Sequence, residues 1–183
     1  MSLASKKYLF LFAAFLVTTT LNAQEPERSP FFIGLEVSAI TKEKHYEDDE
    51  FDVNFIPLVF QGVLGKRMDI RLTTIFNYHT GSNPGMGDIG LYSVFPLYFK
   101  KKESKSTASS GLYIGPVIGF TNNDVNRYHT MTTALEFGYM FRTSKKFTLG
   151  AGMQFGASYF NYSYQENKWV DHLGLKVNLG FWF

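Results

Sequence analysis

Four histidines carry the widest range of chemistry in this sequence. His45, His79, His129 and His172 all fall in, or at the edge of, polar stretches that separate apolar ones. Two of them stand in the same tripeptide, Tyr-His-Thr, at residues 78–80 and 128–130. Imidazole nitrogens bind Zn²⁺ and other borderline metals, so two or more of these side chains would form a metal site if their segments converge. The plainer interpretation is that tyrosine and histidine occupy the wet edge of an apolar surface.

A second candidate for cation binding is an acidic segment. Clustered carboxylates suit Ca²⁺ or Mg²⁺, although no glycine stands where an EF-hand loop needs its sharp turn. A solvated acidic loop is the alternative. The residues concerned are Glu47, Asp48, Asp49, Glu50 and Asp52.

The elements that position these residues begin after an expected export signal. Residues 1–23 combine Lys6 and Lys7 with a short apolar run and a small, polar exit that ends at Ala23. This pattern is typical of a secretory signal peptide. Without it, residues 24–183 carry equal numbers of basic and acidic side chains, so no nucleic-acid-binding surface is expected. The chain has no cysteine, which excludes disulfides and a lipid-modified cysteine.

The rest of the chain, after a short segment at 24–30, is patterned as β-strands. At the C-terminus, Leu173, Leu175, Val177, Leu179, Phe181 and Phe183 alternate with His172, Gly174, Lys176, Asn178, Gly180 and Trp182. This period of two indicates a strand with one apolar face. Eight such segments, each with its connection, need about 20 residues apiece, which fits the length of a small barrel. The expected strands are 31–40, 53–65, 69–78, 89–99, 111–120, 131–142, 147–159 and 172–183.

The connections are expected to alternate in length. Long polar connections are predicted at 41–52, 79–88, 121–130 and 160–171, and tight turns at 66–68 and 143–146. Membrane barrels have this asymmetry, with long loops outside and short turns on the periplasmic side. The exception is the basic, serine-rich connection at 100–110, which is predicted on the side of the short turns.

The polar face of the strands decides which side faces inward. It consists mostly of Gly, Ser, Thr and Asn, with the isolated charges Glu36, Arg71, Glu136 and Lys176. A water-exposed wall would carry many more charges, whereas the narrow interior of an eight-stranded barrel suits small side chains and a few ion pairs. The sequence therefore predicts an all-β, eight-stranded antiparallel up-and-down transmembrane β-barrel over residues 31–183. Its four charges are expected to pair inside.

Two segments carry a family resemblance. Phe-Pro-Leu-Tyr-Phe-Lys at 95–100, followed by Tyr-Ile-Gly-Pro-Val-Ile-Gly-Phe at 113–120, resembles the central hairpin of small Bacteroidota-type outer-membrane β-barrel proteins. Those include eight-stranded adhesin-like and PorT-like barrels. Phe181 and Phe183 match the aromatic positions of the C-terminal signal that the barrel-assembly machinery reads, while the glycine of that signal falls at Asn178. The resemblance implies the outer membrane of a Gram-negative-type cell, with membrane lipid and lipopolysaccharide as partners.

These patterns favour a structural or surface-interaction role, adhesin-like and non-catalytic, through the outer loops. No cofactor is expected beyond a divalent cation at the sites above. One alternative is a lipid A-modifying hydrolase or acyltransferase, which would need a Ser–His–acid set at the rim. Met131 stands two residues after His129, where lipid A deacylases place a serine, and Ser82 and Asp88 are the remaining candidates after His79. The other alternative is a narrow channel or an accessory subunit of secretion or transport.

Overall fold

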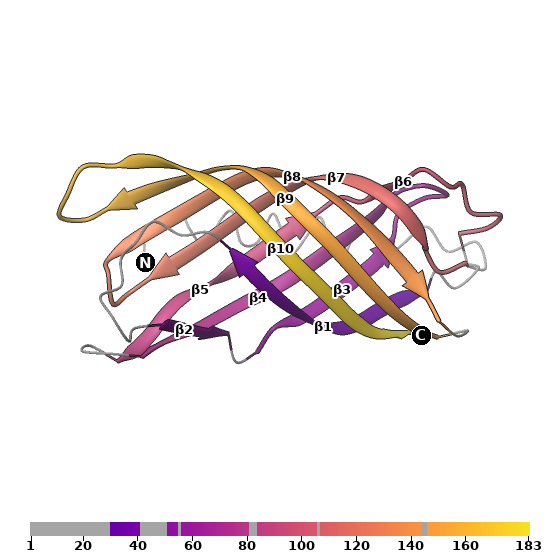
Figure 1. The fold of residues 1–183 in the computed structure, drawn as a ribbon, viewed down its shortest axis with the longest axis horizontal. Coiled ribbons are helices and arrows are strands. Elements are labelled where there is room, and N and C mark those ends of the chain that lie inside the picture. Colours follow the sequence, from indigo (N-terminus) through magenta and orange to yellow (C-terminus); the bar gives the residue numbers. More distant parts are fainter. Residues whose placement is uncertain (1–29, 41–50, 55, 81–83, 106, 144–145) are drawn as a thin grey trace, which may run out of the picture.

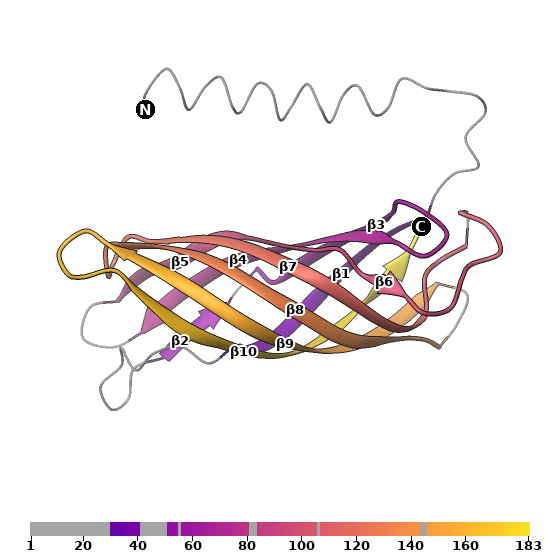
Figure 2. The same ribbon diagram turned by 90° about the horizontal axis from the view of Figure 1, so that it is seen from above.

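The computed structural model describes residues 30–183 except 41–50, 55, 81–83, 106 and 144–145. This part of the chain is all β-structure (Figures 1 and 2), and within it no helix is long and apolar enough to cross a membrane. The strands are β1 (Phe31–Ile40), β2 (Phe51–Asn54), β3 (Leu58–Val63), β4 (Asp69–Thr80), β5 (Gly85–Val94), β6 (Leu97–Tyr98), β7 (Gly111–Asn123), β8 (Tyr128–Arg142), β9 (Phe147–Tyr162) and β10 (Lys168–Trp182).

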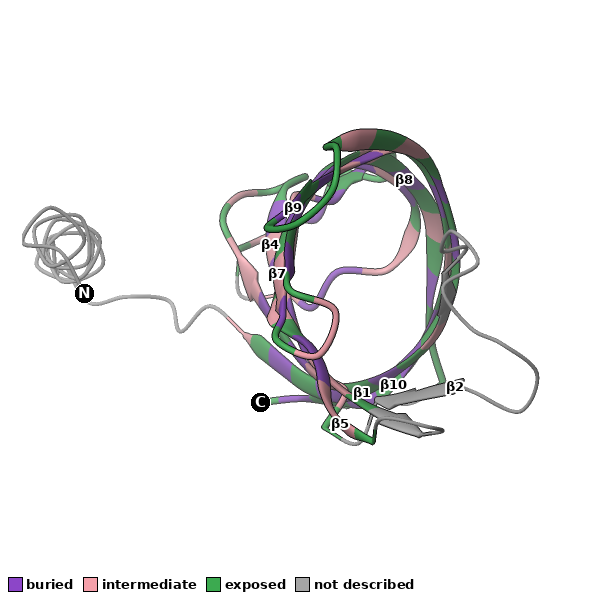
Figure 3. Ribbon diagram, turned by 90° about the vertical axis from the view of Figure 1, so that its left-hand side faces the viewer, coloured by how far each residue is buried: buried purple, intermediate pink, exposed green. Residues whose placement is uncertain are grey.

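Eight of these strands close into an antiparallel barrel (Figure 3). In chain order, β1, β3, β4, β5, β7, β8, β9 and β10 each pair with the next, and β10 returns to β1. At this last seam Phe31 and Phe183 exchange backbone hydrogen bonds of 3.2 and 2.8 Å, and their rings stack. This closure confirms the predicted eight-stranded up-and-down topology, and β2 pairs with β4 as an extra strand.

Two of the predicted strands are interrupted at prolines. The segment predicted at 53–65 forms β2 and β3, separated around Pro57, and the segment predicted at 89–99 forms β5 and β6, separated at Phe95 and Pro96. Proline has no N–H for a ladder, so pairing breaks there. The neighbouring strands still use the carbonyls, because Glu36 N–H donates to Pro57 O and Asp69 N–H donates to Pro96 O. Both unbroken predictions are therefore corrected.

Glycine is required beside the second interruption. A Cβ atom at Gly115 of β7 would lie 2.6 Å from the carbonyl oxygen of Phe95. Only a residue without a side chain lets the backbone of β7 approach the irregular 95–96 segment this closely. This glycine belongs to the Tyr-Ile-Gly-Pro segment on which the family resemblance was based.

The two ends of the barrel differ. We call the end that holds the C-terminus, the turn at 64–68 and the end of β8 the C-terminal end, and the opposite one the loop end (Figure 1). At the loop end, β7 connects to β8 through residues 124–127 and β9 to β10 through 163–167. The longer connections predicted at 121–130 and 160–171 are therefore wrong. Their polar residues still alternate between the two faces, so polarity there does not mark the end of a strand.

The wall has an apolar outer face and a largely polar inner face. Along β10, Leu173, Leu175, Val177, Leu179 and Phe181 are exposed, whereas His172, Gly174, Lys176, Asn178, Gly180 and Trp182 are buried (Figure 3). The predicted orientation of the two faces is confirmed. A barrel of the lipocalin type would have the opposite arrangement.

Candidate functional site

A network of ion pairs crosses the lumen. Arg71 Nη1 lies 2.8 Å from Glu136 Oε1, and Lys176 Nζ lies 2.6 Å from Glu136 Oε2. The same Lys176 nitrogen lies 3.2 Å from Glu36 Oε2. These side chains come from β4, β8, β10 and β1, and all four are buried. The structure thus places the four charges predicted for the interior inside the barrel and joins them in one chain of contacts.

Neutral side chains complete this network toward the C-terminal end. Tyr113 donates a 2.6 Å hydrogen bond to Glu136 Oε1, and Arg71 Nη1 donates to the same tyrosine oxygen at 3.1 Å. Arg71 Nε donates to Gln61 Oε1, and Gln61 Nε2 donates to Asp69 Oδ2 at 2.6 Å. The guanidinium also lies over the Tyr113 ring, 5.0 Å from its centroid. Sequence reasoning missed Gln61 because the phase of β3 could not be assigned from its apolar composition. It missed Tyr113 and Asp69 because only the closed barrel shows which side chains meet across the lumen.

The connection between β6 and β7 folds into the C-terminal mouth of the barrel. Lys102 Nζ lies 3.0 Å from the buried carboxylate of Asp69 and donates to Ser109 Oγ at 2.8 Å. Ala108 packs in an apolar cluster with Phe32, Val59 and Trp182. We call residues 99–110 the C-terminal plug. This segment was predicted as a basic, serine-rich connection on the side of the short turns. Its Lys102 is buried because Asp69 pairs with it.

Toward the loop end, a serine and a histidine meet inside the lumen. Gln154 Nε2 donates to Glu136 Oε2 at 2.7 Å, so its Oε1 is left to accept the proton of His172 Nε2, 3.0 Å away. His172 Nδ1 then has its lone pair toward Ser158 Oγ at 3.4 Å. Thr132 Oγ1 lies 2.8 Å from Ser158 Oγ. A serine beside an oriented imidazole is the basic unit of acyl-transfer sites, but here both groups are buried and an amide stands where a carboxylate would orient the base.

An aromatic layer covers this pair at the loop end of the lumen. Tyr128 packs edge-on against Phe160 and Tyr162, with ring centroids 5.2 and 5.3 Å away. Asn123 Nδ2 donates to Tyr128 Oη at 3.1 Å and to Asp88 Oδ1 at 3.2 Å. All five side chains are buried. Charged, hydrogen-bonded and aromatic layers therefore follow one another through the lumen, with the C-terminal plug at the other end.

Two of the histidines of the predicted cluster, His129 and His172, do not meet. His172 lies in the lumen rather than at the rim, while His129 is exposed on the outer face of β8. The barrel wall separates the two imidazoles, so one metal ion cannot contact both. His172 is not at the rim because β10 begins at Lys168, four residues before the predicted start of this strand. Within the described residues no three His, Cys, Asp or Glu side chains gather in a metal-binding arrangement. The His45 prediction and the His79 side chain lie outside the described part of the structure.

The other predicted site residues are placed only in part. Glu47, Asp48, Asp49 and Glu50 lie outside the described residues, and Asp52 is described only through its backbone pairing with His79. Ser82 also lies outside them. Asp88 is buried in the lumen and bonded to Asn123, so it is not exposed at the rim for a Ser–His–acid set.

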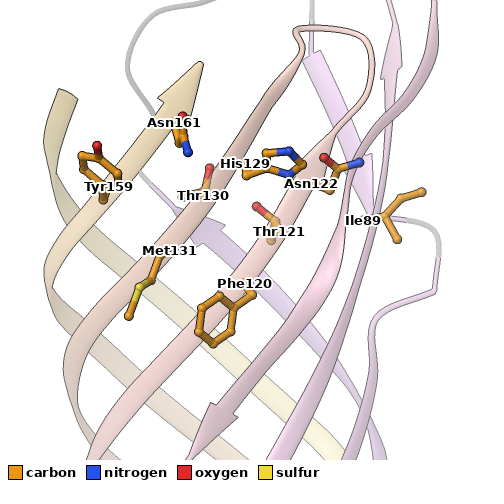
Figure 4. Close-up of a pocket in the computed structure, with 9 residues that line it drawn as sticks. All are labelled: Ile89, Phe120, Thr121, Asn122, His129, Thr130, Met131, Tyr159 and Asn161. Atoms are coloured by element: carbon orange, nitrogen blue, oxygen red, sulfur yellow. The ribbon is translucent and has the colours of Figure 1, made fainter. Parts of the chain in front are cut away.

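A groove of about 430 Å³ lies on the outer wall near the loop end (Figure 4). Its polar row, Asn122, His129 and Asn161, runs across three neighbouring strands, because Asn122 pairs with His129 and His129 with Asn161. Two residues farther along the strands lies an apolar row, formed by Phe120 and Met131 with Tyr159 beside them. The remaining lining residues are Ile89, Thr121 and Thr130. Of these lining residues, the sequence predicted only His129 as a site residue. The others could not be predicted, because the register of three strands brings them together.

The comparisons with known proteins identify no relative. No protein-family model matches this chain. No curated protein matches it significantly. A proposal on function therefore rests on the geometry of the barrel, its packed interior and its outer groove.

Proposed function

We propose that this chain is a small outer-membrane β-barrel of a Gram-negative-type cell, with a structural or surface-interaction role and no catalytic activity. The observation that carries this proposal is the apolar outer face, which continues around the barrel. Exposed leucine, valine, isoleucine, phenylalanine or methionine side chains stand on β1, β3, β5, β7, β8, β9 and β10, and Tyr78 is exposed on β4. Val37 of β1 is 69% exposed. Soluble monomers rarely expose contiguous apolar patches larger than a few hundred Å².

The distribution of charge supports a lipid environment for this face. Among strand residues whose side chains are described, the exposed charged ones are Asp171 and Arg142, and Arg142 ends β8. A basic side chain on the lipid face at mid-bilayer costs about 2–4 kcal/mol. Exposed aromatic residues near the strand ends, such as Trp169 at the loop end and Phe181 and Phe183 at the other, suit the two membrane interfaces.

The packed lumen argues against a channel. The ion-paired layer around Glu136, the aromatic layer at Tyr128 and the C-terminal plug follow one another along the barrel axis. Eight strands enclose an interior that side chains fill. The same layers argue against an esterase or acyltransferase at Ser158, because a lipid ester would have to pass the aromatic layer to reach the hydroxyl.

The interaction role rests on the loop end, with membrane lipid and lipopolysaccharide as partners there. The acidic residues of 41–50 stand in the sequence between β1 and β2, and their clustered carboxylates would bind divalent cations shared with lipid phosphates. We further propose that export uses residues 1–23 and that the barrel-assembly machinery reads Phe181 and Phe183. Both phenylalanines are exposed on the outer face, where another protein can reach them.

A lysine on the outer face tests the membrane location. Leu175 is 53% exposed in the middle of β10, so Leu175→Lys would be harmless in a barrel surrounded by water. In a bilayer it should reduce the folded, heat-modifiable form in the outer-membrane fraction, since the substitution costs about 2–4 kcal/mol. Thr143→Lys, at an exposed turn residue, is the matched control. Recovery of the wild-type protein from the soluble periplasm, or equal behaviour of both variants, would refute the proposal.

Conductance tests the sealed lumen. In planar bilayers the wild-type barrel is expected to show no steady ion conductance, because side chains fill the interior of an eight-stranded barrel. Steady single-channel currents from the purified chain would contradict a purely structural and interaction role and favour the channel alternative.

A further inference from the structure

The outer groove at the loop end is amphipathic along the strand direction. Phe120 and Met131 are large, exposed and apolar, and they lie on the side of the groove nearer the middle of the barrel (Figure 4). Asn122, His129 and Asn161 lie on the side nearer the turns. If the barrel spans a membrane, as proposed above, this order matches a lipid, with acyl chains on the apolar row and the headgroup on the polar row.

The polar row is suited to a neutral headgroup. Every polar lining residue carries atoms that both donate and accept hydrogen bonds, or an imidazole that does so in its neutral form. No lysine or arginine lines the groove. The carboxylate of Asp124 stands next to the row and accepts a 2.6 Å hydrogen bond from Asn122 Nδ2. A phosphate would need cationic donors and would be repelled by this carboxylate, whereas sugar hydroxyls match donors and acceptors alike.

Aromatic side chains extend the groove on one side. Tyr159 lines it, and Trp169 of β10 packs against Tyr159 with ring centroids 5.1 Å apart. The ring faces of Phe120, Tyr159 and Trp169 carry negative quadrupole potential, which the C–H faces of a sugar ring complement. Tryptophan and tyrosine also favour the depth of the headgroups.

We propose that this groove binds the sugar headgroup of a membrane glycolipid. The hydroxyls of the sugar bond to Asn122, His129 and Asn161, and the first part of the acyl chains lies on Phe120, Met131 and Ile89. The proposal rests on the membrane location and adds a specific lipid class to it. It assigns to His129 a binding role that does not involve a metal.

Tryptophan quenching provides a local test. The chain has two tryptophans, and Trp169 is exposed beside the groove, while Trp182 is buried at the C-terminal end. The full-length mature chain is reconstituted in phosphatidylcholine bilayers that contain a minor fraction of one lipid with brominated acyl chains. That lipid is a monoglycosyl diacylglycerol, phosphatidic acid or phosphatidylcholine. Brominated glycolipid should quench Trp169 more than brominated phosphatidylcholine at the same mole fraction, and phosphatidic acid should not.

Variants separate the groove from the rest of the wall. His129→Leu and Asn161→Leu should each lower the local enrichment of glycolipid about fivefold, which corresponds to about 1 kcal/mol for one hydrogen bond. Thr133→Leu, an exposed residue of the same strand outside the groove, is the matched control and should leave it unchanged.

Each outcome has a defined meaning. The proposal would be overturned if brominated glycolipid quenched Trp169 no more than brominated phosphatidylcholine. It would also be overturned if His129→Leu and Asn161→Leu both kept the extra quenching. Greater quenching by phosphatidic acid that His129→Leu abolishes would show a phosphate site instead. Absence of quenching by every brominated lipid would show that the barrel does not enter bilayers, and the proposed function would fail with the groove.

Discussion

Lys176 and Arg71 contact opposite oxygens of one buried carboxylate, that of Glu136, at 2.6 and 2.8 Å. The carboxylate stands on β8, and the two cations stand on β10 and β4. Three strands distributed around the ring are thereby connected through the lumen. Because all three charges are buried, the loss of the shared carboxylate leaves cations that water cannot solvate.

Glu136→Gln should therefore be strongly destabilising. Breaking a buried ion pair by removing one partner typically costs about 3–5 kcal/mol, and here two cations lose the same charge. The measurement is the urea midpoint of the barrel folded in detergent, with the slope of the transition unchanged. Glu36→Gln is the control, since Glu36 has a single ion pair with Lys176 at 3.2 Å and should cost less. Equal losses in the two variants would show that the network does not centre on Glu136.

Gly138→Ala should disturb the same network from the backbone. An added Cβ would collide with Tyr113 Oη and would lie 2.7 Å from the carbonyl oxygen of Ala151. Tyr113 would have to leave its hydrogen bonds to Glu136 and Arg71. We expect a loss of about 1–3 kcal/mol in the free energy of unfolding, as for other overpacking substitutions.

Gly62→Ala is the matched control for this substitution. Its nearest neighbour would be Ile70 Cγ2 at 3.8 Å, an ordinary contact. Replacing a strand glycine by alanine should then be neutral or stabilising by about 0.5 kcal/mol. Gly138→Ala should therefore lower the urea midpoint, whereas Gly62→Ala should leave it unchanged or raise it. A similar decrease in both variants would contradict the role assigned to Tyr113.

The strand β10 illustrates what the sequence could predict. Its alternation is strict, so both its faces could be predicted from the sequence. Its pairing with β1 follows from the closure that an up-and-down barrel requires. In β3 the neighbouring residues Val59 and Phe60 are both apolar, yet the first is buried and the second exposed. Hydrophobicity cannot assign the phase of such a strand, because both faces have the same composition.

The sites show where local patterns are insufficient. The ion pair of Lys102 with Asp69 joins residues 33 positions apart, and only the folded barrel brings them together. Likewise, the row of Asn122, His129 and Asn161 depends on the register of three strands. The polar residues before His172 predict a loop and so place it at the rim, whereas the ladder continues to Lys168.

Lys102→Ala should loosen the C-terminal plug. The substitution removes the ion pair with Asp69 and the hydrogen bond to Ser109, and it leaves the buried Asp69 carboxylate with the hydrogen bond from Gln61. Local opening then becomes more frequent, and trypsin should cleave faster after Lys100, Lys101 and Lys105, which are exposed in the same segment. Initial cleavage rates of the folded barrel in detergent measure this effect.

Lys101→Ala controls for the loss of a basic residue. Lys101 is exposed, so its removal should delete one cleavage site without accelerating the others. Ser109→Ala keeps the ion pair and removes one hydrogen bond, and its rate should fall between the wild type and Lys102→Ala. If Lys102→Ala is cleaved at the wild-type rate, the ion pair does not hold the plug in the mouth.

The two described histidines should react differently with a carbethoxylating reagent such as diethyl pyrocarbonate. His129 is exposed on the outer wall, whereas His172 lies in the lumen and is 4% exposed. The His172 ring is hydrogen-bonded to Gln154 and faces Ser158. In the folded barrel the reagent should modify His129 much faster, and in urea both should react at similar rates, since unfolding removes the wall. Mass spectrometry of the separate peptides reports each site, and the ratio of rates before and after unfolding corrects for intrinsic reactivity. Equal rates in the folded state would mean that the aromatic layer around Tyr128 opens readily to solutes, which would restore a substrate route to Ser158.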